Sequence, residues 1–152
     1  AVALDSRRLV KMVLETAQLL SSACNMLKIE ADGVYKNTHY NHPCAVFARK
    51  TFPNFKWLVE HGLALSAEFE RRFGNVHASE EVIMLCYRSM CAAVEHGKGL
   101  TPGWDGPLVF SFNCSGFNTG DLFEDFRLCM RRKWDTDSLQ PKWSRRGAPV
   151  WR

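Results

Sequence analysis

Four of the five histidines of this 152-residue chain fall between residues 35 and 77, beside amide, cationic and aromatic side chains. Histidine has an unperturbed pKa near neutrality, so clustered imidazoles are typical of sites for proton transfer, phosphate contact or metal binding. The block indicates a site without naming its reaction. We select these candidates from it: Asn41, His42, Arg49, Trp57, His61, Glu68, Arg72 and His77.

A second set of polar residues, Arg8, Lys11 and Glu15, recurs at the spacing that places side chains on one face of a helix. Gln18 and Ser22 continue the same stripe. One interpretation is a solvated ladder of charges. The other makes Glu15 a general acid/base or a stabiliser of a cation, with Arg8 and Lys11 binding phosphates.

The polar residues after Pro53 also follow one edge of a predicted helix, beside an apolar stripe. Antiparallel packing could bring this edge against the Glu15 stripe, although Glu68 and Arg72 also have the spacing of an ordinary ion pair. We predict one common cavity lined by Glu15, His42, His61, Glu68 and Arg72. Glu15 and His42 are the candidate catalytic residues.

A metal site is a weaker interpretation of the histidines. His39 and His42, with His61 and His77, match no established zinc spacing, so we expect neither a metal nor another cofactor. His42 directly precedes Pro43, which also fits a helix cap followed by proline at the first helical position.

The elements that position these residues all have helical periodicity, so we predict an all-α fold in a single domain over residues 1–152. A long loop or lid over 97–120 contains a possible extended piece at 108–110, and a basic aromatic tail covers 134–152. The predicted helices cover residues 5–27, 43–50, 53–74, 79–97 and 121–133.

Composition excludes several classes of protein. No run of about 18 apolar residues exists, so we expect no membrane span, and residues 1–8 lack the order of a secretory signal. The six cysteines show no C-x-x-C pair, which favours reduced, structural thiols. We expect a monomer in the cytoplasm.

Charge is unevenly distributed along the chain. Residues 127–152 hold eight Lys/Arg against two Asp, and also three of the five tryptophans, Trp134, Trp143 and Trp151. Cations interleaved with flat rings suit a polyanion whose bases can stack, so we predict binding of double-stranded DNA through Trp134 and Trp143. The alternative is a solubilising tail whose tryptophans fold back onto the core.

The run from Ser6 to Glu15, SRRLVKMVLE, resembles the early helix of the phage pyrimidine-dimer DNA glycosylases. The resemblance implies a compact helical DNA-binding enzyme, with Glu15 in the catalytic position and Arg8 in the basic one, working as a viral protein in the host cell. The central block, including Asn41-His42-Pro43-Cys44, resembles uncharacterised proteins of phages and large DNA viruses.

One departure concerns the nucleophile. That family uses its terminal amine, some twenty residues before the glutamate, whereas fourteen residues precede Glu15 here. A helix continued back to Ala1 would place its amine about 20 Å from Glu15 at ~1.5 Å per residue. We therefore predict that Ala1 is not the functional N-terminus and that a further native segment returns to the Glu15 stripe.

Three functions remain open from the sequence. The first is a glycosylase/AP-lyase-like enzyme acting on a damaged or modified pyrimidine, with an extrahelical base replaced in the stack by Trp57 or a tail tryptophan. The second is a phage thymine-hypermodification transferase, and the third is a non-enzymatic DNA-binding module. Duplex binding should weaken steeply with salt, and less steeply once residues 134–152 are removed.

Overall fold

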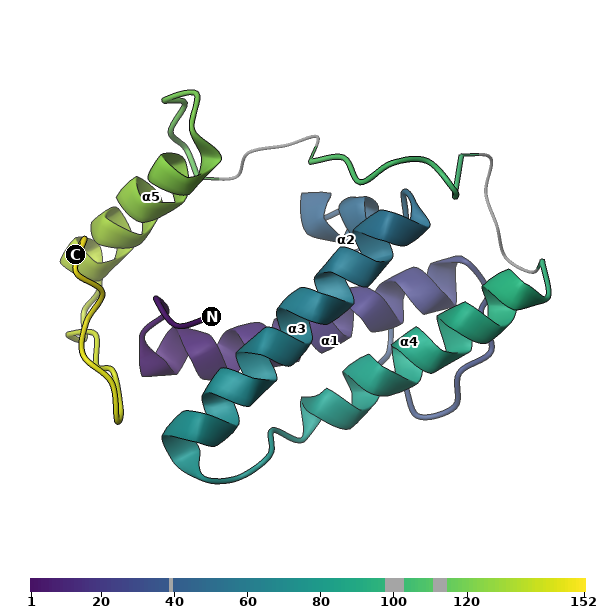
Figure 1. Cartoon of the computed structure of the whole chain (residues 1–152), viewed down its shortest axis with the longest axis horizontal. Coiled ribbons are helices and arrows are strands. Elements are labelled where there is room, and N and C mark those ends of the chain that lie inside the picture. The colour runs from purple at the N-terminus through teal and green to yellow at the C-terminus, as the bar shows by residue number, and fades with distance from the viewer. Residues whose placement is uncertain (39, 98–102, 111–114) are drawn as a thin grey trace.

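The computed structural model describes residues 1–38, 40–97, 103–110 and 115–152, and within them it contains five α-helices and no strand (Figure 1). This confirms the predicted all-α class. The expected extended piece at 108–110 has no regular structure. The helices are α1 (Ser6–Met26), α2 (Pro43–Ala48), α3 (Phe52–Phe73), α4 (Ser79–Glu95) and α5 (Leu122–Thr136).

The helix ends follow local chemistry that the sequence displays. Asp5 and Thr51 accept hydrogen bonds from the backbone N–H three residues on, which satisfies donors that have no partner inside the helix. Pro43 and Pro53 stand in the first turns of α2 and α3. Gly74 ends α3 with φ 78°, a left-handed conformation that glycine adopts at little cost.

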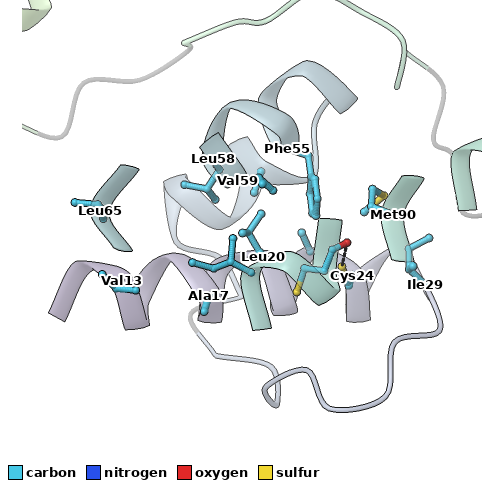
Figure 2. Close-up of a cluster of buried hydrophobic side chains, with 14 of the residues drawn as sticks. Val13, Ala17, Leu20, Cys24, Ile29, Phe55, Leu58, Val59, Leu65 and Met90 are labelled. Carbon is cyan, nitrogen blue, oxygen red and sulfur yellow. Dashed lines mark hydrogen bonds between the residues drawn. The ribbon is translucent and has the colours of Figure 1, made fainter. Parts of the chain in front are cut away.

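Three helices, α1, α3 and α4, enclose the apolar core, and Figure 2 shows side chains of α1 and α3 meeting in it. At the crossing of α1 and α3 stands Gly62. A Cβ there would lie 2.7 Å from Thr16 Cγ2 and 2.9 Å from Ile83 Cδ1, so the bare glycine lets the helices approach closely. The short α2 packs against both α1 and α3.

Side chains of the helices hold the two described loop segments. Ser21 Oγ accepts a hydrogen bond from Tyr35 N, and Ser22 Oγ donates one to Thr38 O, so the loop after α1 lies along that helix. Buried Asn54 accepts from Val109 N at 2.9 Å and donates to Val109 O at 3.4 Å. Residues 103–110 of the predicted lid are thus attached to the start of α3.

The two ends of the chain lie together, with α5 and the tail beside the start of α1 (Figure 1). Ser6 N donates to Lys142 O at 2.7 Å, and Trp134 Nε1 donates to Asp5 Oδ2 at 3.0 Å. Residues 1–4 form a turn ahead of the predicted helix start: Leu4 N donates to Ala1 O, which closes this turn before the Asp5 cap.

Five cysteines lie in the described residues and all have free thiols; Cys114 lies outside those residues. In the core, Cys24 Sγ donates to Cys86 O, a contact drawn in Figure 2. Its hydrogen bond with the Cys86 thiol, together with burial, raises the pKa of Cys24 far above its usual value. None of the described helices is both long enough and apolar enough to cross a bilayer.

Candidate active site

Glu15 and His42 line one pocket of about 190 Å³ between α1 and the start of α2. The rest of its wall comes from Met12, Gln18, Leu19 and Cys44. Sequence reasoning placed Glu15 and His42 in one cavity, and here the structure brings them together. A larger hollow of about 290 Å³ at the far ends of α1 and α4 contains none of the candidates, so we assign the chemistry to the smaller pocket.

Glu15 is half-buried on α1, and its Oε1 lies 3.1 Å from the Nζ of Lys11, one helical turn earlier. Lys11 is 70 % exposed, so this pair meets solvent at the rim of the pocket. An exposed pair four residues apart stabilises a helix by only a few tenths of a kcal/mol. Both groups therefore remain accessible to a ligand.

His42 is the N-cap of α2. Its Nδ1 accepts a hydrogen bond from Cys44 N at 3.2 Å, which requires Nδ1 to be unprotonated and leaves the ring proton on Nε2. The cap therefore fixes the orientation of the imidazole at the pocket. Capping and catalysis were separate interpretations of His42 from sequence, but one ring can serve both.

Arg49 and Asn41 flank α2. Arg49 Nη1 donates to Tyr40 O at 2.8 Å, and its guanidinium lies 5.1 Å from the centroid of the Tyr40 ring. Asn41 is exposed beside His42. Neither residue lines the pocket.

On α3, the His61 ring stacks on Trp57, with centroids 5.2 Å apart and planes 6° from parallel. Trp57 also meets Phe47 of α2 and Phe110 of the loop at their edges. Burial, with a smaller contribution from the positive amino group of Ala1, lowers the pKa of His61 to about 4. His61 is accordingly neutral at pH 7.

Two segments, α2 and the tail, each contact residues of both α1 and α3. His42 of α2 shares the pocket with Glu15, while Phe47 of α2 packs on Trp57. The tail behaves likewise: Asp137 pairs with Arg8 of α1 at 2.8 Å, and Arg146 pairs with Glu68 of α3 at 2.8 Å.

A family model described as pyrimidine dimer DNA glycosylase matches residues 1–82, more than half of the chain. The chain belongs to this family. No curated protein and no solved structure matches it.

The part of the chain that matches the glycosylase family contains the whole pocket. Residues 1–82 include all of α1, α2 and α3 and the first turn of α4, whereas α5 and the tail lie outside the match. Glu15, His42 and His61 thus belong to the glycosylase part, and the tail's role has to be judged from its own contacts.

The common cavity predicted for five residues is wrong for three of them. His61, Glu68 and Arg72 do not line the pocket of Glu15 and His42. Glu68 is 5 % exposed and receives hydrogen bonds from Arg71, Arg72 and Arg146, which hold the pKa of its carboxyl well below the usual range. Arg72 points inward and donates to Leu4 O and Val2 O, so it anchors the N-terminal turn.

Arg8 was expected to bind phosphate, but its guanidinium is taken up inside the protein. It pairs at 2.8 Å with Asp5 and with Asp137 and is 17 % exposed. Burial alone would raise the pKa of Asp5, but hydrogen bonds from Arg8 and Trp134 outweigh it and hold that pKa below its usual value. Arg8 therefore joins the helix cap to the tail.

His77 is likewise placed away from the pocket. Its Nδ1 accepts from Ser79 N at 3.1 Å at the start of α4, and its ring meets Phe69 edge-on. Burial lowers the pKa of His77, against an opposing hydrogen bond with the backbone of Val10. The imidazole links α1, α3 and α4, which is a structural role.

Trp134 and Trp143 were predicted as stacking surfaces for bases, and the structure corrects this. Trp134 is 1 % exposed, with Trp143 and Trp151 rings 5.2 and 5.4 Å from its own. Trp143 Nε1 donates to Ala3 O. These contacts agree with the alternative interpretation, in which the tail's tryptophans fold back onto the core.

No group of three or more potential metal ligands occurs among the residues that the structure describes; His39 lies outside them. Sequence reasoning missed the apolar pocket walls, Met12 and Leu19. Their signal was present, since both flank Glu15 on the predicted helix and lie off its main apolar stripe.

Proposed function

We propose that this chain is a DNA glycosylase with AP-lyase chemistry that removes a damaged or modified pyrimidine from duplex DNA. The observation that carries the proposal is the shared pocket of Glu15 and His42, within the residues that match the glycosylase family. Neither alternative function gains a specific observation of its own.

The pocket has the composition needed to hold one extrahelical base. Met12 and Leu19 offer apolar surface to the faces of a ring, while Gln18 and His42 offer hydrogen-bonding groups to its edge. Enzymes that act on a base turn it out of the duplex into a pocket of this kind and read its edge by hydrogen bonds.

The reaction that we assign to the site needs an amine and a carboxylate. The amine's lone pair forms a bond to C1′, the bond from C1′ to the base breaks, and the base leaves with that electron pair and takes up a proton. One amine proton is lost, the nitrogen lone pair forms a second bond to C1′, and the C1′–O4′ bond breaks, with O4′ taking its electron pair and a proton; loss of the second amine proton then gives the imine. Glu15 stabilises the cationic sugar and transfers the protons.

Lys11 supplies an amine beside that carboxylate, with its Nζ 3.1 Å from Glu15 Oε1. The amino group of Ala1 lies in the turn that Arg72 anchors. Its pKa is lowered, mainly by burial and also by the charge of Arg72, against the opposing charge of Glu68. The reacting amine can be identified directly, because borohydride reduces the imine to a stable adduct.

The test uses a duplex with one cyclobutane pyrimidine dimer. Wild-type protein should break the glycosidic bond of one pyrimidine of the dimer, so that photoreversal of the cyclobutane ring releases its base, and should form a borohydride-trapped adduct, whose mass-spectrometric mapping names the amine. Glu15→Gln should slow release at least ~100-fold, since positioned acid–base groups contribute that much or more. Glu60→Gln, at an exposed carboxylate of α3, is the matched control.

Full-rate release by Glu15→Gln, or no release and no adduct with wild-type protein on damaged duplex, would overturn the proposal. If wild-type protein binds the duplex and leaves every base in place, the non-enzymatic DNA-binding interpretation replaces it.

A further inference from the structure

Three arginines bind a single carboxylate where the C-terminal end of α3 meets the tail, and a fourth, Arg145, contacts one of them through its backbone carbonyl. Arg71 and Arg146 each bind Glu68 through two nitrogens, at 2.8–2.9 Å and at 2.8–3.1 Å, and Arg72 Nε binds it at 2.6 Å. Arg71 Nη1 also donates to the carbonyl of Arg145 at 3.3 Å. The cluster thus joins two segments more than seventy residues apart.

A turn in the tail presents two of these arginines. Arg146 N donates to Trp143 O, and Arg145 has φ 53°, a left-handed conformation that is strained for a residue with a side chain. The turn directs the Arg145 carbonyl at Arg71 and leaves the Arg145 residue exposed.

The cations exceed what the carboxylate can balance. Arg72 is fully buried and holds the backbone of residues 2 and 4, so its charge serves the fold. Arg71 and Arg146 are 42 % and 36 % exposed, and the exposed Arg145 stands beside them. Asp137 of the tail does not offset them, because it pairs with Arg7 and Arg8.

We propose that Arg71, Arg145 and Arg146 form a binding patch for DNA phosphates. The inference rests on the proposed function, which supplies the partner. Partly exposed guanidiniums in excess over carboxylates are the groups that bind the DNA backbone without reading its sequence. The tail then contributes to binding by charge, since its tryptophans pack inward.

The position of the patch suits a duplex whose reacting base occupies the Glu15 pocket. The tail meets α1 at Ser6, nine residues before Glu15, which is ~14 Å along a helix that rises 1.5 Å per residue. Successive phosphates of one strand are ~3.4 Å apart along the duplex axis, so the span from Ser6 to Glu15 corresponds to about four nucleotides. The tail that presents the patch pairs with α1 through Asp137 and Arg8 and with α3 through Arg146 and Glu68.

The test measures the affinity for an undamaged duplex at several salt concentrations by fluorescence anisotropy. Arg71→Gln and Arg145→Gln should each weaken binding equally on unrelated sequences and reduce the log–log salt slope by ~0.9, the contribution of one phosphate contact. The control, Lys28→Gln, removes one charge at the opposite end of α1 and should leave the slope unchanged. Melting curves establish folding, and Arg145→Gln, at an exposed side chain, suffices if Arg71→Gln unfolds.

Unchanged slopes in folded Arg71→Gln and Arg145→Gln, or an equal loss with Lys28→Gln, would show that the cluster only clamps the tail. Binding of the undamaged duplex by wild-type protein that does not depend on salt concentration would overturn the proposal as well. Failure of the proposed function gives a different result: the patch variants lose slope as expected, but wild-type protein releases no base from damaged duplex.

Discussion

Trp134 donates its indole N–H to the carboxylate of Asp5 over 3.0 Å, and the same carboxylate caps α1. The last helix is therefore joined to the first turn of the helix that carries Glu15. Asp5 is 1 % exposed and also pairs with Arg8, so three groups depend on one buried carboxylate. Removal of one partner leaves a buried charge poorly compensated.

Trp134→Ala should destabilise the protein by about 3–5 kcal/mol, because it removes a buried indole that packs on two other tryptophans. Urea unfolding measures the change. Phe123→Ala is the control, since that ring is 78 % exposed and its loss should stay within ~0.5 kcal/mol. Similar stability of the two variants would show that the tail is not packed as described. Because the tail carries these contacts, deletion of residues 134–152 is a poor test of DNA binding.

His42→Asn should separate capping from catalysis. Asparagine caps helices well, so Asn should keep the fold within a few tenths of a kcal/mol, whereas His42→Ala should cost about 1 kcal/mol. Both variants lose the imidazole and should lose base release at least ~100-fold. A His42→Asn protein with wild-type base release would restrict His42 to the capping role.

Gly62→Ala should destabilise the protein by about 1–3 kcal/mol, because its Cβ would lie 2.7 Å from Thr16 Cγ2. Thr16→Ser removes that methyl group and retains the hydroxyl that donates to Met12 O, so the double variant should recover part of the loss. A double-mutant cycle measures the recovery. Strictly additive effects would place the strain elsewhere, for instance against Ile83.

Acid should destabilise the fold through His61. Its folded pKa of about 4 lies below its ordinary value of 6.5, so between these values the unfolded chain binds more protons. The contribution of His61 to the free energy of unfolding is fully present above pH 6.5. It is lost as the pH falls toward 4, by at most about 3 kcal/mol at ~1.4 kcal/mol per pKa unit.

Urea unfolding at pH 7 and pH 4.5 checks whether the free energy of unfolding falls as the pH is lowered. His61→Gln should narrow the difference in unfolding free energy between the two pH values. His96→Gln, which removes an exposed imidazole, should leave it as in the wild type. An undiminished acid loss in His61→Gln would assign it to other groups such as His77, whose pKa burial also lowers.

The helices could be predicted because their signals are local. Capping residues, prolines in first turns and Gly74 mark the ends within a few positions, and apolar periodicity marks the buried faces. The shared pocket of Glu15 and His42 could be predicted as well, because Glu15 lies on a helical polar stripe and His42 directly precedes Pro43 at a helix start. Their meeting needed only that α2 pack against α1.

The contributions of distant segments were beyond local patterns. Nothing in the spacing of Glu68 shows that Arg146, 78 residues later, will occupy its carboxylate, and nothing near Arg8 points to Asp137. The tail's composition suited both DNA stacking and inward packing. The tail's tryptophans pack inward because burying large aromatic rings together in the protein interior is more favourable than leaving them in water.

The hydrogen bond from Ser6 to the carbonyl of Lys142 has a consequence for synthesis of the protein. A nascent chain leaves the ribosome from its amino end, so α1 emerges long before the segment that completes its first turn. Until then Asp5, Arg8 and Glu68 lack partners that arrive with residues 134–146. We expect the early helices to collapse first and to acquire their final order late, since contacts between remote parts of a chain form slowly.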